Sequence, residues 1–202
     1  MKEKRLLIAL LALATVMLFL GALPIRGEGE IYSTVIRLHV LANSDSEEDQ
    51  ALKLQVRDAI LEVTEPLLRG CVSREEAEQI LEINSGVLKE TAETTLRAAG
   101  CCNSNVTITL TEESYPTRSY DSFCFPSGSY LSLQVRIGEA EGQNWWCCLF
   151  PPLCVGAATV TEEEAEESFL AVGLTPSQYK VITETEKPIY KVRFKLLELL
   201  FG

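Results

Sequence analysis

The stretch IYSTVIRLHVLANSDSEEDQALKLQVRDAILEVT, residues 31–64, contains patterns typical of a strand, a turn and a helix in succession. Apolar and polar residues alternate through its first part, which predicts a strand over residues 31–42. Leu38 and Val40 would then face a core, while Arg37 and His39 would lie on the opposite face. His39 is the one histidine among 202 residues, which makes it a candidate functional residue.

A turn and a helix start follow this strand. Residues 43–46 are Asn-Ser-Asp-Ser, whose side chains suit a tight turn and a helix N-cap. Ser44 and Glu47 have the spacing of a capping box. Apolar residues then recur at helical spacing, so we predict a helix that runs to about Thr64 and is ended by Pro66.

The remaining patterns indicate the fold class. We expect helical sequence over residues 73–99, a strand at 106–111, a hairpin turn at 126–128 with an outgoing strand at 131–137, a strand at 145–150 and a short acidic helix at 161–171. Residues 190–201 have helical spacing and alternate nearly as well, so their state, helix or strand, stays open. This order predicts an α+β domain, in which helices pack on one face of a largely antiparallel sheet.

Residues 1–27 have the layout of an export signal. Lys2, Lys4 and Arg5 precede a run from Leu6 to Leu20 that carries no charge, as in a secretory leader. We therefore expect an N-terminal apolar leader helix, either a cleaved signal peptide or a retained membrane anchor. Residues 28–202 would form one exported domain outside the cytoplasmic membrane, secreted or anchored to its outer side.

The charge of this exported domain limits its partners. Residues 1–27 hold four of the 18 Lys and Arg residues and one of the 29 Asp and Glu residues, which leaves 14 against 28 in residues 28–202, a formal net charge of −14. Such a domain is repelled by phosphate backbones and by anionic headgroups. We expect no nucleic-acid partner, and contact with a membrane only through an uncleaved leader.

The chain has seven cysteines, at positions 71, 101, 102, 124, 147, 148 and 154. Cys147 and Cys154 flank a Pro-Pro turn, so they are a candidate disulfide in an exported chain. The cysteine spacings do not match a metal finger, and we expect neither a metal nor a cofactor. An alternative function is that of an exported thiol-dependent hydrolase, in which His39 activates Cys147 or Cys148.

Some residues are typical of protein interfaces. Two adjacent tryptophans in a strand point to opposite faces, so one of Trp145 and Trp146 can fill the core while the other contacts a partner. Arg118 lies in a connection rich in tyrosine and proline. The polar residues near the first strand suit either a partner surface or ordinary turns and caps. The candidate partner-binding residues are Arg37, His39, Asn43, Asp45, Arg118, Trp145 and Trp146.

Several segments, in this order, resemble the stage II sporulation protein R family. They are residues 36–46, Asp49, Gln50, Lys53, residues 56–59, 115–120, 126–130, 137–140, 142–147, 150–154 and 192–198. The match spans about residues 31–200, and blocks of this length are specific. Cys101, Cys102 and Cys148 depart from the pattern, which puts any role for them in doubt.

The resemblance implies a role in endospore formation rather than an enzymatic activity. Members of this family are made in the forespore and exported into the space between the forespore and mother-cell membranes. There they activate a membrane-embedded aspartic protease, stage II sporulation protein GA, which removes the pro-sequence of sigma-E. The partner implied for this chain is therefore that protease, and the candidate residues above would contact its outward-facing part.

Overall fold

The computed structural model describes residues 4–5, 11–13, 15–16, 28–101, 105–119, 124–155, 158–159, 162–172, 174–175 and 179. The chain divides into two compact units, Gly27–Glu186 and a second unit made of Met1–Arg26 and Lys187–Gly202. In the second unit the described residues are helical, and most of the predicted leader and all of residues 190–201 lie outside the described residues. Within the described part of the chain, no helix is long and apolar enough to cross a bilayer.

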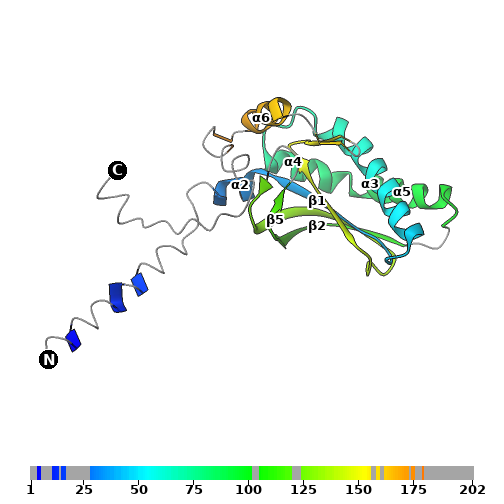
Figure 1. Ribbon diagram of the computed structural model, residues 1–202. Coiled ribbons are helices and arrows are strands. Elements are labelled where there is room, and N and C mark those ends of the chain that lie inside the picture. The colour runs from blue at the N-terminus through cyan, green and yellow to red at the C-terminus, as the bar shows by residue number, and fades with distance from the viewer. Residues whose placement is uncertain are drawn as a thin grey trace. The chain divides into compact units, whose positions relative to one another are not determined.

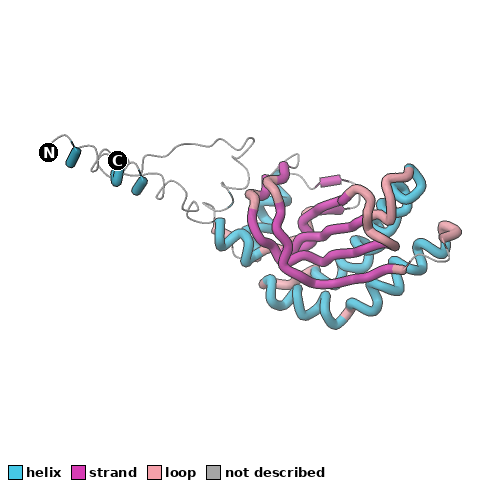
Figure 2. Tube along the Cα trace, turned by 90° about the horizontal axis from the view of Figure 1, so that it is seen from below, coloured by secondary structure: helices cyan, strands magenta, loops and turns pink. Residues whose placement is uncertain are grey.

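The body of the larger unit is a four-stranded sheet with the order β2-β5-β1-β6. These strands are β2 (Val106–Tyr115), β5 (Gly128–Ile137), β1 (Ile36–Leu41) and β6 (Asn144–Phe150), and they lie side by side in Figure 2. β5 pairs antiparallel with β2, and β1 pairs antiparallel with β6, whereas β1 and β5 run parallel. The prediction of a largely antiparallel α+β sheet is confirmed.

Three helices cover one face of this sheet, as Figure 1 shows. They are α3 (Glu47–Leu68), α4 (Arg74–Ile83) and α5 (Ser85–Ala98). Their apolar stripes meet the apolar side chains of the strands in one core, because alternate strand residues face the same side of a sheet. This main core includes Leu38, Val40, Leu52, Val56, Ile60, Leu81, Leu88, Leu96, Leu133 and Val135.

A second, smaller core lies on the opposite face, which we call the outer face. It contains Ile31, Val35, Tyr115, Phe125, Tyr130, Cys148, Leu153, Phe169, Leu174 and Tyr179. These residues come in part from α2 (Glu28–Thr34), α6 (Glu162–Ala171) and a hairpin of β3 (Arg118–Ser119) and β4 (Cys124–Phe125). A second two-stranded pair joins β7 (Cys154–Val155) to β8 (Ala158–Thr159).

Three local predictions around β1 and α3 are wrong. Residues 31–34 belong to helix α2 rather than to the strand, because Ile31 and Val35 are buried on one side at helical spacing. The N-cap of α3 is Ser46 and not the predicted Ser44, since Oγ of Ser46 accepts a hydrogen bond from the Asp49 amide at 3.1 Å. Pro66 lies inside α3, where a proline close to the C-terminal end removes only one hydrogen bond of the helix.

Candidate functional site

The outer face of the sheet brings together polar and aromatic side chains from distant parts of the sequence. Alternate residues of β1 lie on this face, and residues of β5 and β6 lie beside them in register. β2 pairs with the other edge of β5. We call this group the outer-face cluster. It consists of Arg37, His39, Glu113, Tyr115, Arg118, Gln134, Asn144 and Trp146.

His39 lies at the centre of this cluster and is 8% exposed. Its Nδ1 lies 3.0 Å from Oε1 of Glu113, and its Nε2 lies 2.8 Å from Oδ1 of Asn144. Both neighbours present oxygen atoms, so a ring nitrogen that carries a proton has an acceptor on either side. The ring is therefore held on two sides by groups from β2 and β6.

Glu113 is the carboxylate of the cluster and is fixed by its donors. Besides His39, the side-chain amide of Gln134 donates to its Oε1 at 2.7 Å. Burial acts to raise the pKa of Glu113, but the hydrogen bonds from His39, Ser132 and Gln134 and the charge of the imidazole outweigh burial and lower it. The cluster therefore holds Glu113 in its ionised form.

The indole ring of Trp146 packs beside the imidazole ring of His39. The two ring centroids are 5.5 Å apart, and the guanidinium carbon of Arg118 lies 3.9 Å from the Trp146 centroid. Both Arg118 and Trp146 are half-buried. This stacking of an arginine on a tryptophan is a cation–π contact, and it fixes the plane of the guanidinium.

Arg37 lies in the core rather than on a contact surface. Its side chain is 0% exposed, and its Nε donates to the backbone oxygen of Cys147 at 3.0 Å. The rings of Tyr115, Phe125 and Tyr130 lie 4.6–5.4 Å from its guanidinium carbon. The three aromatic rings stabilise the charge of the buried guanidinium where water is excluded. Arg37 therefore has a packing role in the cluster.

Asn43 and Asp45 join two loops at one end of the sheet. Asn43 Oδ1 accepts from the Glu139 amide at 3.1 Å, and Asp45 Oδ1 accepts from the Gln143 amide at 2.8 Å. The Asn43 amide nitrogen also donates to Asp49 at 2.8 Å. Because these contacts connect the β1–α3 turn with the β5–β6 loop, we call this group the loop junction.

Two glycines are essential to the geometry of the loop junction. Gly138 has a φ of +56°, and a Cβ there would overlap Oδ1 of Asn43. A Cβ on Gly142 would overlap the carbonyl oxygen of Ser44 and lie 2.9 Å from the Cβ of Ala42. Lys53 closes the arrangement from α3, since its Nζ donates to the backbone oxygen of Gln143 at 3.0 Å. Asn43 and Asp45 thus have structural roles in this fold.

Trp145 points to the face opposite Trp146, as predicted for adjacent residues of a strand. It packs against the main core, and the guanidinium carbon of Arg57 in α3 lies 4.9 Å from its ring centroid. Arg57 is itself buried and pairs with Asp58 at 2.7 Å. Of the two tryptophans, Trp146 is therefore the one that belongs to the outer-face cluster.

His39 does not form the catalytic dyad with Cys147 or Cys148 that the alternative function requires. Cys147 is disulfide-bonded, and it faces the main core rather than His39. Cys148 shares the outer face but stands opposite Arg37, and its thiol donates to backbone oxygens of Phe150 and Pro151 at 3.3 and 3.5 Å. Burial raises the pKa of the Cys148 thiol to about 12, so it stays protonated and poorly nucleophilic.

The disulfide predicted between Cys147 and Cys154 stays a prediction. Cys147 takes part in a disulfide, while Cys71, Cys101, Cys124 and Cys148 are free thiols. The side chain of Cys154 lies outside the described residues.

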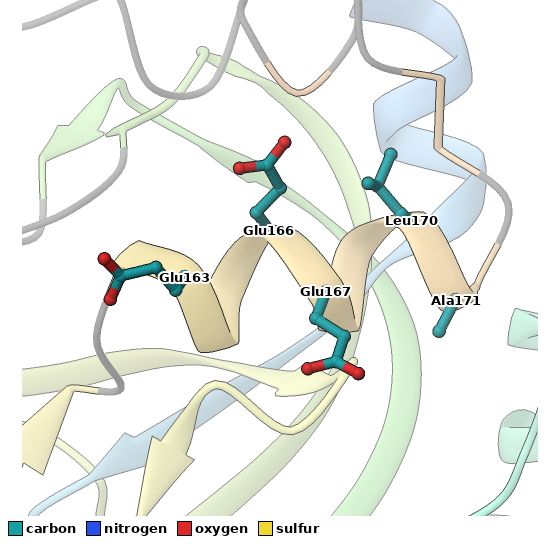
Figure 3. Close-up of a pocket in the computed structure, with 5 residues that line it drawn as sticks. All are labelled: Glu163, Glu166, Glu167, Leu170 and Ala171. Atoms are coloured by element: carbon teal, nitrogen blue, oxygen red, sulfur yellow. The ribbon is translucent and has the colours of Figure 1, made fainter.

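A hollow beside α6 is lined by Glu163, Glu166, Glu167, Leu170 and Ala171. Figure 3 shows that the three carboxylates point in different directions rather than towards a common centre. Side chains from a single helix do not enclose a ligand, so we assign no binding role to this hollow. In the part of the chain that the structure describes, no group of three His, Cys, Asp or Glu side chains could hold a metal ion.

Four residues of the cluster were missed from the sequence, and Tyr115 is one of them. Glu113, Gln134 and Asn144 come from three different strands, and local patterns do not show which strands pair. Glu113 and Asn144 lie 74 and 105 positions from His39. A signal was present for Glu113, because it continues the polar side of the alternating β2 pattern.

The fold and the cluster define an α+β domain with helices on one face of the sheet and, on the other, a smaller core beside a partly buried polar and aromatic cluster. The family model of stage II sporulation protein R (spore_II_R) matches residues 32–160, and the chain belongs to that family. The stage II sporulation protein R of Bacillus subtilis (strain 168) is 36% identical over 138 residues. This match covers 66% of the chain and 61% of the length of that relative. No solved structure matches the chain.

Proposed function

We propose that this chain is an exported signalling protein that activates the membrane-embedded aspartic protease stage II sporulation protein GA. It acts in the space between the forespore and mother-cell membranes, which it reaches through the leader in residues 1–27. The activated protease then removes the pro-sequence of sigma-E. Membership of the stage II sporulation protein R family, over residues 32–160, is the observation that carries this proposal.

The chemistry of the outer-face cluster supports a role in recognition. Arginine and tryptophan are the side chains that most often dominate protein interfaces, and the half-buried Arg118 stacks on Trp146 on the outer face of the sheet. Both ring nitrogens of His39 face oxygen acceptors, so neither faces a thiol or a hydroxyl that it could activate. We therefore do not propose the hydrolase alternative.

Activation would follow from binding. The protease has an inactive and an active form, and a ligand shifts the balance only as far as it binds the active form more tightly. A difference of about 100-fold in affinity corresponds to about 2.7 kcal/mol. The signal therefore requires contacts that complement the outward-facing part of the active protease.

The test uses vegetative cells that carry the matched protease, pro-sigma-E and a sigma-E reporter. The chain is expressed with and without residues 1–27, and removal of the pro-sequence is followed by immunoblot. Processing only in the presence of the leader would support an exported trigger. Absence of processing with the full, verifiably exported chain and a protease from the same genome would refute the proposal.

A further inference from the structure

The outer-face cluster is positively charged although the chain as a whole is acidic. The formal net charge of the chain is −11, yet the cluster contains Arg37 and Arg118 with Glu113 as its carboxylate. Arg136 lies on the same face, because it stands beside Leu41 in register with the alternate residues of β1. The half-buried cations of this face, Arg118 and Arg136, favour an anionic ligand.

Glu113 does not neutralise Arg118, the half-buried cation of the cluster. Its carboxylate is occupied by His39 at 3.0 Å and by Gln134 at 2.7 Å. Within the described residues, Arg118 makes no ion pair, and its Nε is buried without a hydrogen-bond acceptor. Because Nε is buried, a ligand would reach this guanidinium through its two Nη groups.

The geometry of Arg118 suits a carboxylate in particular. Its stacking on Trp146 fixes the guanidinium plane, and a planar guanidinium binds a carboxylate through two parallel hydrogen bonds. Asn144 stands two residues before Trp146 on the same face, and its Oδ1 is already used by His39. Its amide nitrogen is a further donor for the same ligand.

We infer that Arg118, stacked on Trp146, binds an aspartate or glutamate carboxylate of the partner protein, with Asn144 as a second donor. This inference rests on the proposed function, since the partner is taken to be the protease. It adds the contact chemistry, namely an acidic segment on the outward-facing part of that protease. It also assigns recognition to the outer face and not to the loop junction.

The experiment measures binding of the full chain to the detergent-solubilised protease, together with pro-sigma-E processing in cells. We compare the wild type with Arg118→Lys, Arg118→Gln and Arg118→Glu. The matched control is Arg97→Glu in α5, which makes the same charge change at an exposed residue on the helical side of the sheet. Abundance and circular dichroism of each variant show whether it is folded.

We expect Arg118→Gln to weaken binding by about 10- to 100-fold, the range for a lost hydrogen bond between charged groups. Arg118→Lys should fall between the wild type and Arg118→Gln, because it keeps the charge but loses the planar fork. Arg118→Glu should abolish activation, and replacing one acidic residue of the protease by lysine should restore it. Arg97→Glu should bind like the wild type.

Binding of Arg118→Glu within about twofold of the wild type would overturn the inference. Equal losses for Arg97→Glu and Arg118→Glu would also overturn it, since the effect would then come from total charge. If the wild-type chain itself neither binds nor triggers processing, the proposed function fails, and this inference fails with it. If the wild type binds and Arg118 is dispensable, only the inference fails.

Discussion

Substitution of Gly142 by alanine tests the role of the loop junction. A Cβ at this position would overlap the carbonyl oxygen of Ser44 and lie 2.6 Å from its carbonyl carbon. Those atoms belong to the backbone that leads into α3, so they cannot turn away as a flexible side chain could. The β5–β6 loop must therefore move away from the β1–α3 turn in Gly142→Ala.

The expected loss of stability follows from the contacts that this movement breaks. The Gly142 amide donates to the Ala42 oxygen at 3.0 Å, and the Gln143 amide donates to Asp45 at 2.8 Å. Each such hydrogen bond contributes about 1 kcal/mol, and overpacking costs about 1–3 kcal/mol. We expect Gly142→Ala to lower the free energy of unfolding by about 3–5 kcal/mol, a large share of the usual 5–15 kcal/mol.

Urea unfolding of the chain without residues 1–27, followed by circular dichroism and tryptophan fluorescence, measures this change. With a slope of about 2 kcal/mol per M, the midpoint should fall by about 2 M. The control is Gly86→Ala in α5, where a Cβ would meet no atom within 4 Å, and which should stabilise by about 0.5–1 kcal/mol. A Gly142→Ala protein within about 1 kcal/mol of the wild type would refute the packing argument.

Four further predictions follow from buried groups. Arg37→Ala should destabilise the chain by about 3 kcal/mol or more, measured by urea unfolding. Iodoacetamide at pH 8 should modify Cys148 only after unfolding, as peptide mass spectrometry would show, because burial raises its pKa to about 12. The folded-state pKa of Glu113 is lowered from 4.5, so the ionised carboxylate stabilises the fold above that pH, and this stabilisation is lost as the pH falls through the folded-state pKa. The difference in unfolding free energy between the wild type and Glu113→Gln, measured by urea unfolding, should therefore shrink with acidification. Peptide mapping under non-reducing conditions should recover Cys147 linked to Cys154, and a Cys147 linked elsewhere would contradict that pairing.

The sequence predicted the elements whose periodicity is strong and uninterrupted. In β2, Val106 and Ile108 alternate with threonines, and the strand pairs with β5 over its full length. The long helix after Asn43 was equally clear. The C-terminal end of this helix was predicted too early, at Pro66. A proline is tolerated in the last turns of a helix, because it removes few hydrogen bonds there.

The pairing of distant strands could not be predicted from local patterns. β1 lies between β5 and β6, although about ninety residues separate β1 from β5 in the chain. His39 therefore meets Glu113 and Asn144 only after the sheet has formed. The sequence also did not show that Arg37 is buried and Arg118 half-buried, because the burial of both depends on the same strand pairing.

The distribution of the family signature affects how mutations should be interpreted. Residues 43–50 and 137–143, which carry much of the resemblance, form the loop junction. Loss of signalling after Asn43→Ala or Gly142→Ala would then report misfolding, because the contacts that these residues make are internal. Among the contacts of the described residues, the side chain of Arg118 has no internal role beyond its stacking on Trp146. Arg118 is therefore the residue at which a loss of signalling with normal stability would identify a contact surface.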